Sequence, residues 1–322
     1  MNKPVTSTEL TADRAAPRIV LFVEEGGGDW HARRLARALE ARGSTVVITT
    51  LKDCAFDTSL PSGLDIPGFG GALPDGAFVR SVSTGTLEQI TFRLGILHAL
   101  RESGVRVWND ARAIERCVDK STTTFFLQKD GVPTPRTWTG VKREQAIDLV
   151  KTMTREGHLL VQKPLFGAQG KGLRLIASPS DLAPAEEVNG VYYLQEFIRP
   201  KVDGSHRDWR LFVLAGRVVA SMIRHGSSWI TNIKQGARAE AAIPDQDLIS
   251  LALRATASVG ADYAGVDIIE APEGGYLVLE VNSMPAWNGL QQVTRTKIAD
   301  QLVAAFLHDA LGEPRSEGQE GA

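Results

Sequence analysis

The residues from 266 to 281, VDIIEAPEGGYLVLEV, constrain the fold most strongly. Two apolar runs flank Pro272-Glu273-Gly274-Gly275, whose turn-forming residues predict a β-hairpin. If the hairpin is symmetric about that loop, Asp267 lies opposite Glu280, and strand alternation puts Asn282 on the face of Glu280. Two carboxylates across a buried strand pair repel each other, and a hard cation such as Mg²⁺ removes that penalty. The segment therefore predicts a metal site, and a slipped register or a solvent-exposed pair is the alternative.

The first third of the chain alternates strands and helices. An apolar strand over residues 18–23 precedes a glycine turn, a helix that Asp29 can cap and that ends near Arg42, and a strand over residues 46–49. This order predicts a parallel sheet. The turn does not match a dinucleotide-binding motif, because His31 stands where a further glycine is required. Elements over residues 78–81, 86–102 and 105–108 complete a first lobe near residue 113.

The rest of the chain is richer in strands. A helical region over residues 111–131 breaks near Asp119, close to the weak helix formers Thr122 and Thr123. A middle lobe has a helix over 143–156 and strands over 159–163, 173–176 and 192–198. A C-terminal lobe has strands over 208–214, 217–224, 262–269 and 276–281 and helices over 245–259 and 297–311. The predicted fold class is α/β, with a loose tail (1–16), lobes over 17–113, 114–198 and 199–312, and a frayed end (313–322).

Charge and cysteine content exclude several classes of protein. Among 322 residues, 36 Lys and Arg stand against 38 Asp and Glu, and this net charge of -2 lacks the basic excess of nucleic-acid-binding proteins. No apolar run approaches the length of a membrane span. Cys54 and Cys117 alone cannot build a disulfide framework or a zinc site. We therefore expect a soluble cytoplasmic protein without a nucleic-acid or membrane partner.

A glycine-rich stretch between two strands, Gly167-Ala168-Gln169-Gly170-Lys171-Gly172, is typical of a backbone that approaches phosphate closely. It is not a Walker loop, because Gly172 replaces the Ser or Thr after the lysine. A tight β-hairpin explains the same residues. Lys163, at the end of the preceding apolar strand, favours phosphate binding because a lysine there needs an anionic partner. An edge lysine that keeps its ammonium group in water is the alternative.

Other polar residues lie among apolar strand residues. Arg210 and Arg224 either bind carboxylate or phosphate groups or pair with Asp208 and its neighbours. The strand end Gln195-Glu196-Phe197-Ile198 offers backbone N–H and C=O groups that an adenine edge could use. In the first lobe, Arg80 stands at a strand end, where open α/β sheets receive ligands. It is either a residue that binds the acceptor substrate or a surface arginine.

Taken in order, these motifs resemble those of the RimK-type glutamate ligases of the ATP-grasp superfamily. The resemblance extends from residue 109 to residue 311, about two-thirds of the chain, and the first lobe is similar to the pre-ATP-grasp domain of that family. Each motif alone is weak, but the ordered series is specific, and it implies an ATP-grasp fold. The motifs are Asn109, Asp119-Lys120, GVPTP (131–135), VQKP (161–164), the glycine-rich stretch, QEFI (195–198), DWR (208–210), TN (231–232) and LEVNSMP (279–285).

The resemblance implies an ATP-dependent carboxylate–amine ligase. The γ-phosphate of ATP would pass to a carboxylate, and an amine would attack the resulting acyl phosphate to form an amide. Mg²⁺, with Mn²⁺ as an alternative, would bind Asp267, Glu280 and Asn282. Lys163 and Arg224 would act in catalysis, with Arg224 clamping the acyl phosphate. The implied ATP contacts are Lys120, Lys163, Gly167, Gln169, Gly170, Lys171, Gly172, Gln195, Glu196, Phe197, Ile198, Asp208 and Asn232.

Departures from the family pattern concern the substrate. Ile230 and Gln235 stand where relatives have arginines, which leaves fewer cations around the nucleotide or an acidic substrate. Trp287 either stacks on a ring-bearing substrate or packs between lobes. The SMPAW variant over residues 283–287 is similar to a RimK-type subgroup associated with pterin or furan C1-carrier biosynthesis. The implied substrate residues are Arg80, Arg210 and Trp287.

The resemblance further implies that an amino acid, glutamate above all, is joined to a small molecule or a peptide end, and it allows a homo-oligomer. A ligase for another amino acid, or for a tyrosine or tyramine derivative, is an alternative within enzymes. A nucleotide-binding regulatory protein without catalysis is an alternative of another class. Retention of both lysines and of all three implied metal ligands argues against it, and His31 argues against a Rossmann-type oxidoreductase.

Overall fold

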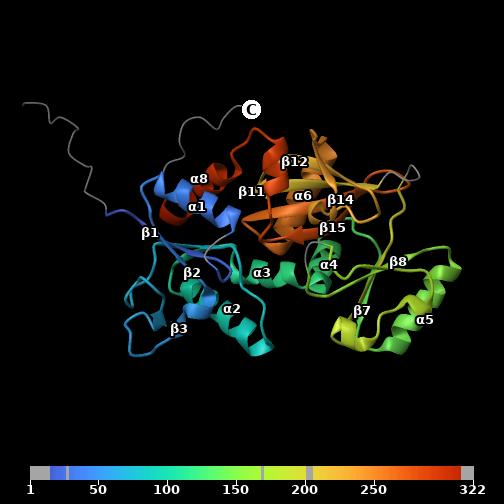
Figure 1. The fold of residues 1–322 in the computed structure, drawn as a ribbon, viewed down its shortest axis with the longest axis horizontal. Helices are drawn as coiled ribbons and strands as arrows, with labels where there is room; N and C mark the ends of the chain where they lie inside the picture. The colour runs from blue at the N-terminus through green and yellow to red at the C-terminus, as the bar shows by residue number, and fades with distance from the viewer. Residues whose placement is uncertain (1–14, 27–28, 168–169, 201–205, 313–322) are drawn as a thin grey trace, which may run out of the picture.

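The computed structural model describes residues 15–26, 29–167, 170–200 and 206–312, so nearly all of the predicted tail and the whole frayed end lie outside it. Its strands form three larger sheets and one two-stranded sheet, with helices around them, which confirms the α/β class. Figure 1 shows the sheet of the C-terminal strands between the other two, along the long axis of the molecule. The division into lobes stays a prediction. No helix of the described ranges is long and apolar enough to cross a membrane.

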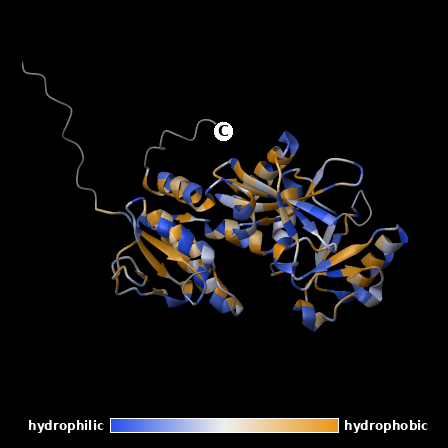
Figure 2. Cartoon of the chain, turned by 45° about the horizontal axis from the view of Figure 1, so that its top comes forward, coloured by the Kyte–Doolittle hydropathy of each residue, from blue (hydrophilic) through white to orange (hydrophobic). Residues whose placement is uncertain are grey.

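The first sheet is parallel, as the sequence predicts, and its strands follow the order β2-β1-β5-β6. Asp29 caps its first helix, because the side chain accepts a hydrogen bond from the N–H of Ala32. Figure 2 shows apolar residues along the strands of this sheet. The elements are β1 (Arg18–Phe22), α1 (Trp30–Glu40), β2 (Thr45–Thr49), η1 (Leu51–Asp53), β3 (Ala55–Phe56), β4 (Leu64–Asp65), β5 (Gly76–Val79), α2 (Leu87–Glu102) and β6 (Arg106–Trp108).

Asp119 separates two helices at the predicted break, because its side chain accepts hydrogen bonds from the N–H groups of Ser121 and Thr122 and starts a new helix. The middle sheet that follows is antiparallel, in the order β7-β10-β8-β9. Strand β7 is not predicted, since its four residues are only partly buried. The elements are α3 (Ala111–Val118), α4 (Lys120–Lys129), β7 (Thr137–Gly140), α5 (Arg143–Arg155), β8 (Leu160–Lys163), β9 (Arg174–Ile176), η2 (Pro179–Asp181), η3 (Ala185–Val188) and β10 (Tyr192–Glu196).

The C-terminal sheet is antiparallel, in the order β13-β12-β11-β14-β15. The sequence does not predict β13, which is mostly exposed at a sheet edge, or α7, which has six residues. The elements are β11 (His206–Leu214), β12 (Arg217–Gly226), η4 (Ile233–Gln235), β13 (Arg238–Ala241), α6 (Gln246–Val259), β14 (Tyr263–Glu270), β15 (Tyr276–Asn282), α7 (Asn288–Val293) and α8 (Ile298–Leu311).

The β14–β15 hairpin pairs Asp267 with Glu280, as predicted. The hairpin is not symmetric along its whole length, however. Nearer the turn, Ile268 pairs with Val278, so Leu279 is an extra residue on β15 and the register shifts by one at this bulge. Near the turn the strands pair about a centre half a residue earlier than the symmetric hairpin predicts. The extra residue of the bulge restores the predicted register beyond it, so Asp267 still faces Glu280.

One apolar cluster joins the first sheet to the C-terminal sheet. The ring centre of Phe78 on β5 lies 5.4 Å from that of Phe306 on α8 and 5.4 Å from that of Tyr263 on β14. Helix α8, from the end of the chain, lies beside α1 (Figure 1) and packs into the same cluster. The middle sheet has its own cluster, built from α5 and the strands of that sheet. Among the residues that the structure describes, the C-terminal sheet therefore shares an apolar cluster with the first sheet and not with the middle one.

Candidate active site

A cavity of about 280 Å³ lies between the middle sheet and the C-terminal sheet. Strands β8 and β10 contribute to one wall, and strands β11, β12, β14 and β15 contribute to the other. The structure thus gathers residues that are up to 160 positions apart (120 to 280) in sequence. The predicted site residues that line it are Lys120, Lys163, Gly167, Gly170, Lys171, Gln195, Glu196, Phe197, Ile198, Asp208, Arg224, Asn232, Asp267 and Glu280.

Several predicted site residues are placed elsewhere. Gly172, Arg210, Asn282, Arg80 and Trp287 are not among the residues that line the cavity. Gln169, predicted as an ATP contact, lies outside the described residues. Arg210 and Asn282 still contact or adjoin lining residues, whereas Arg80 and Trp287 belong to the junction with the first sheet.

Lys163 ends β8 with its ammonium group in the cavity. Removal of this group from water lowers the pKa of Lys163 to about 8, although the nearby carboxylate of Glu280 opposes the shift. The positive charge of Lys120 lowers it further. Lys120, the first residue of α4, donates a hydrogen bond from Nζ to the carbonyl oxygen of Gly167 at 2.8 Å. Two cations therefore face the cavity beside the glycine-rich stretch.

The side chain of Gln195 orients Lys163, a role that is not predicted from the sequence. Lys163 Nζ donates to Gln195 Oε1 at 2.6 Å, and Gln195 Nε2 donates in turn to Thr137 Oγ1 (3.1 Å) and to the hydroxyl of Tyr193 (3.2 Å). The Tyr193 hydroxyl also contacts Thr124 Oγ1 at 2.9 Å. Strand alternation indicates this contact, because Tyr193 pairs with Lys163 across the sheet and Gln195 lies on the same face of β10 as Tyr193.

Two arginines and two aspartates form a buried cluster at the cavity wall, and all of them except Arg210 line the cavity. Arg224 binds Asp208 (Nε to Oδ1, 2.8 Å) and Asp267 (Nη2 to Oδ2, 2.9 Å), and Arg210 binds both oxygens of Asp267. Burial acts to raise the pKa of Asp267, but Arg210 and Arg224 hold it below its ordinary value. Of the two alternatives for these arginines, pairing with neighbouring aspartates describes the structure. The guanidinium of Arg210 holds Asp267, and its contact with substrate stays a prediction.

Glu280 differs from Asp267 in having a carboxylate that remains available. Within the described part of the chain, no hydrogen bond or ion pair holds this carboxylate, and Glu280 lines the cavity. Asn282 lies two residues farther along β15, on the same face, and its Oδ1 accepts a hydrogen bond from the N–H of Met284 at 3.0 Å. The described residues contain no group of three or more His, Cys, Asp or Glu side chains suited to a metal. The predicted metal ligands are two carboxylates and one amide, so they do not form a group of that kind.

Some backbone groups of the predicted adenine-binding segment already form hydrogen bonds with neighbouring backbone. The N–H groups of Glu196 and Phe197 donate to the carbonyl oxygens of Arg136 and Leu159, each at 2.8 Å. An adenine edge would therefore have to use other backbone groups of residues 195–198. Trp229, whose ring meets that of Phe197 edge-on at 5.9 Å, also lines the cavity. Trp229 is not predicted from the sequence, although an aromatic residue in a polar stretch is a signal for a binding site.

Comparisons with known proteins decide the family. The family model of the RimK-like ATP-grasp domain matches residues 117–306 of this chain. The chain belongs to this family. Its relatives include the tetrahydromethanopterin:alpha-L-glutamate ligase of Methanocaldococcus jannaschii, which is 35% identical over 241 residues that cover 72% of this chain and 79% of the relative.

Other relatives of the RimK-like chain act on different molecules. The alpha-aminoadipate–LysW ligase LysX of Saccharolobus solfataricus is 30% identical over 63% of this chain and 75% of its own. A structure of the ATP-grasp ligase PsnB with a phosphomimetic variant of its minimal precursor, Mg and ADP covers 92% of this chain and 99% of its own, with a TM-score of 0.70 and 20% identity. The RimK-like chain is an ATP-grasp ligase, an enzyme that joins a carboxylate and an amine at the expense of ATP.

The glycine-rich stretch of this RimK-like chain packs against the segment that carries Asn232. Gly170 has φ of +71°, and a Cβ there would lie 2.5 Å from Asn232 Oδ1 and 3.0 Å from Ile230 Cγ2. Only glycine fits both the backbone angle and the space. Ile230, which stands where relatives are expected to have an arginine, lines the cavity and puts an apolar side chain in its wall.

Trp287 of the RimK-like chain corrects one prediction. Its ring is 1% exposed and lies 4.5 Å from the ring of His31 and 6.0 Å from that of Phe212. Packing between sheets, and not stacking on a substrate, is what the structure has. The guanidinium carbon of Arg80 lies 4.8 Å from the centre of the Trp287 ring, and Arg80 Nε and Nη1 are buried without a hydrogen-bond partner among the described residues. Arg80 stays a predicted acceptor residue.

Proposed function

We propose that this ligase joins L-glutamate to a carboxylate of a small-molecule carrier, of which a pterin is the first candidate. In the proposed reaction the γ-phosphate of ATP passes to the carrier carboxylate, giving ADP and an acyl phosphate. The amine of glutamate then attacks the acyl carbon, the C–O bond to phosphate breaks, and the amide forms with release of inorganic phosphate and of the proton that the amine loses. The relatives named as glutamate ligases for tetrahydromethanopterin support this choice of substrates.

The observation that carries the proposal is the charge arrangement of the cavity. Lys120 and Lys163 point into it, while the guanidinium groups of Arg210 and Arg224 are neutralised by Asp208 and Asp267. Arg207, a further cation of the lining, pairs with Glu270. The lining lysines, Lys120, Lys163 and Lys171, are therefore the cations left for the phosphates of ATP, and hydrogen bonds of this kind are charge-assisted. Lys163 is also held in place by Gln195, so little reorganisation is needed when a phosphate binds.

The residues present fit a Mg²⁺ ion. All the proposed ligands, Asp267, Glu280 and Asn282, provide oxygen atoms, and Glu280 has a carboxylate that no described side chain occupies. Asp267 is also held by Arg210 and Arg224, which would keep its carboxylate in place for the ion. When bound, Mg²⁺ supplies neutralisation of phosphate charge. Mn²⁺ accepts the same oxygen ligands and stays an alternative.

Two catalytic roles remain proposals. Arg224 lines the cavity and lies next to Asp267, so it is placed to stabilise a phosphate or acyl phosphate once it shares its contacts with the aspartates. Lys163 would neutralise the transferring phosphoryl group. The acceptor is proposed to enter from the carboxyl ends of the first sheet, where Arg80 follows β5.

The test is a screen for phosphate release from ATP, with mass spectrometry of the products. We expect ADP to form only when glutamate and a carboxylate-bearing pterin are both present, with one glutamyl group added to the pterin. A parallel arm supplies alpha-aminoadipate and a peptide that ends in glutamate. Product in that arm alone would replace the small-molecule carrier by a peptide carrier. Tight ATP binding without turnover in any arm would instead indicate a nucleotide-binding regulatory protein.

A further inference from the structure

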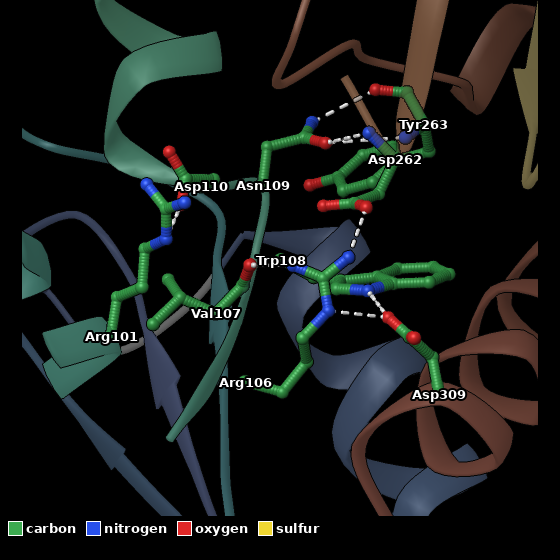
Figure 3. A network of polar contacts seen from close by, with 9 residues as sticks. All are labelled: Arg101, Arg106, Val107, Trp108, Asn109, Asp110, Asp262, Tyr263 and Asp309. Atoms are coloured by element: carbon green, nitrogen blue, oxygen red, sulfur yellow. Dashed lines mark hydrogen bonds and ion pairs between the residues drawn. The ribbon is translucent and has the colours of Figure 1, made fainter. Parts of the chain in front are cut away.

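A buried asparagine connects the first sheet to the segment that carries the proposed metal ligands. Asn109 follows β6 directly and is fully buried. Its Nδ2 donates to the carbonyl oxygens of Tyr263 (2.8 Å) and Ser283 (2.5 Å), and its Oδ1 accepts from the N–H groups of Asp262 (2.6 Å) and Tyr263 (3.2 Å). Figure 3 shows the Asn109 amide between β6 and the start of β14.

These contacts use the whole hydrogen-bonding capacity of the amide, which has two donor hydrogens and one oxygen with two lone pairs. They hold backbone groups of two segments that are twenty positions apart in sequence (263 and 283). An Asn109 side chain that moves must break several buried hydrogen bonds at once, which is costly. The turn after β15 is therefore fixed to β14 and β6 by one side chain.

This turn begins at Asn282, the third proposed metal ligand. Within the turn, Asn109 donates a hydrogen bond to the carbonyl oxygen of Ser283. The N–H group of Met284 donates to the side chain of Asn282. The far end of the turn is held by helix α1, because His31 Nε2 accepts from the N–H of Trp287 at 3.1 Å. The segment from 283 to 287 is thus anchored at both ends by side chains of the first part of the chain.

A second polar group at the same junction does not reach this turn. Arg106, on β6, binds Asp262 and Asp309, and the indole N–H of Trp108 also donates to Asp309 (Figure 3). These contacts join β6 to β14 and α8 but leave the segment after β15 untouched. Arg106 therefore provides a comparison for Asn109, since both stabilise the junction and only one contacts the turn.

We propose that Asn109 is a positioning residue for the metal site: it sets the place of Asn282 by holding the carbonyl of Ser283. This rests on the proposed Mg²⁺ site at Asp267, Glu280 and Asn282. Changing a residue that orients a metal ligand through a hydrogen bond typically lowers metal affinity by about 10- to 100-fold. The inference also assigns the first sheet a part in metal binding, although none of its residues lines the cavity.

The test compares Asn109→Asp with Arg106→Gln. The aspartate keeps the size of the side chain and the two contacts that Oδ1 accepts, but it places an oxygen against the carbonyls of Tyr263 and Ser283. We expect the Mg²⁺ concentration that half-saturates binding of ADP, measured by calorimetry, to rise about 10- to 100-fold in Asn109→Asp. In Arg106→Gln it should stay within about two-fold of the wild type. The KM for ATP at saturating Mg²⁺ should change little in either variant.

Equal Mg²⁺ midpoints in the two variants, at matched stability in urea, would overturn the positioning role. Asn109→Ala serves as a second variant, and failure of both Asn109 variants to fold would also overturn the proposal, because Asn109 would then be a folding determinant. Glu280→Gln separates this result from failure of the metal site itself. If Glu280→Gln binds ADP with the wild-type Mg²⁺ midpoint, the metal assignment is wrong; if it loses the response while Asn109→Asp does not, only the positioning role is wrong.

Discussion

The C-terminal sheet meets its two neighbours in opposite ways. Toward the first sheet it shares an apolar cluster that includes Phe78, Tyr263 and Phe306, and the buried amide of Asn109 makes its hydrogen bonds there. Toward the middle sheet it leaves a cavity of about 280 Å³ lined by charged side chains. The apolar junction fixes geometry through close packing. The charged junction keeps groups such as Lys163 and Glu280 available for a ligand.

The difference shows how this ligase can combine a rigidly packed junction with a cavity that is open to ligands. The turn that carries Asn282 is anchored from the packed side, while the side chains that would meet ATP come from both walls of the cavity. A site divided in this way needs a fixed wall for the metal and a wall that accommodates nucleotide. Variants on the two sides should therefore have different effects, and the following experiments address them in turn.

The largest effect is expected on the cavity side, from Glu280→Gln. Loss of the available carboxylate should reduce turnover by at least about 100-fold, because a metal ligand is lost outright. The urea midpoint should remain near that of the wild type, since no described hydrogen bond or ion pair holds Glu280. Glu273→Gln, the same change in the exposed turn of this hairpin, is the matched control. Wild-type ADP production by Glu280→Gln would remove Glu280 from the site.

The packed junction should respond most strongly to Phe306→Ala. Phe306 is fully buried against Phe78 and Trp108, so its removal leaves a cavity and should cost about 3–5 kcal/mol of unfolding free energy. Phe125→Ala, at a ring that is 59% exposed on α4, should cost less than about 1 kcal/mol. Urea denaturation checks both values. Similar losses in the two variants would mean that the shared cluster adds little to stability.

A smaller effect is expected from pH on nucleotide binding. Because burial lowers the pKa of Lys163 to about 8, its ammonium group is charged at pH 7 and loses its proton as the pH rises through 8. ATP affinity should therefore fall by up to about tenfold for each pH unit above 8. Lys163→Arg keeps its charge throughout this range, so its affinity should stay flat. Calorimetry between pH 7 and about pH 9.5 checks both, and a flat wild-type profile would contradict the role of Lys163.

The smallest effect is expected at Arg80, on the boundary of the packed junction. Arg80→Ala should raise the KM for the acceptor about five-fold, as expected for loss of a partly solvated ion pair of about 1 kcal/mol, and leave the KM for ATP unchanged. Arg34→Ala is the control, because Arg34 also lies over a tryptophan ring, that of Trp30, at 5.2 Å. Equal changes in both KM values, or none, would leave the acceptor pocket unlocated.

Local patterns in the sequence predicted much of the fold and the wall of the cavity. The Asp267–Glu280 pair follows from strand alternation and turn chemistry, and the helix break at Asp119 follows from its capping side chain. Such features depend on neighbours within about twenty residues. The parallel first sheet was also predictable, because helices between strands require it.

Features that depend on distant residues were not predictable. Trp287 is buried by His31, 256 positions earlier, and nothing in the sequence near Trp287 signals that contact. The pairing of Arg210 with Asp267 was open for the same reason, since it depends on which strands become neighbours. The bulge at Leu279 escaped notice because a single extra residue leaves the apolar pattern almost unchanged.

The position of α8 beside α1 has a consequence for the order in which the chain can fold. Synthesis proceeds from the N-terminus, so the strands of the first sheet leave the ribosome long before residue 306 is made. The cluster that covers Ile19 and Leu35 is completed by Leu302 and Phe306. Until then, apolar surface of the first sheet is open to water or to chaperones. In a nascent chain that stalls before residue 298, the first sheet therefore lacks the helix that covers its apolar cluster.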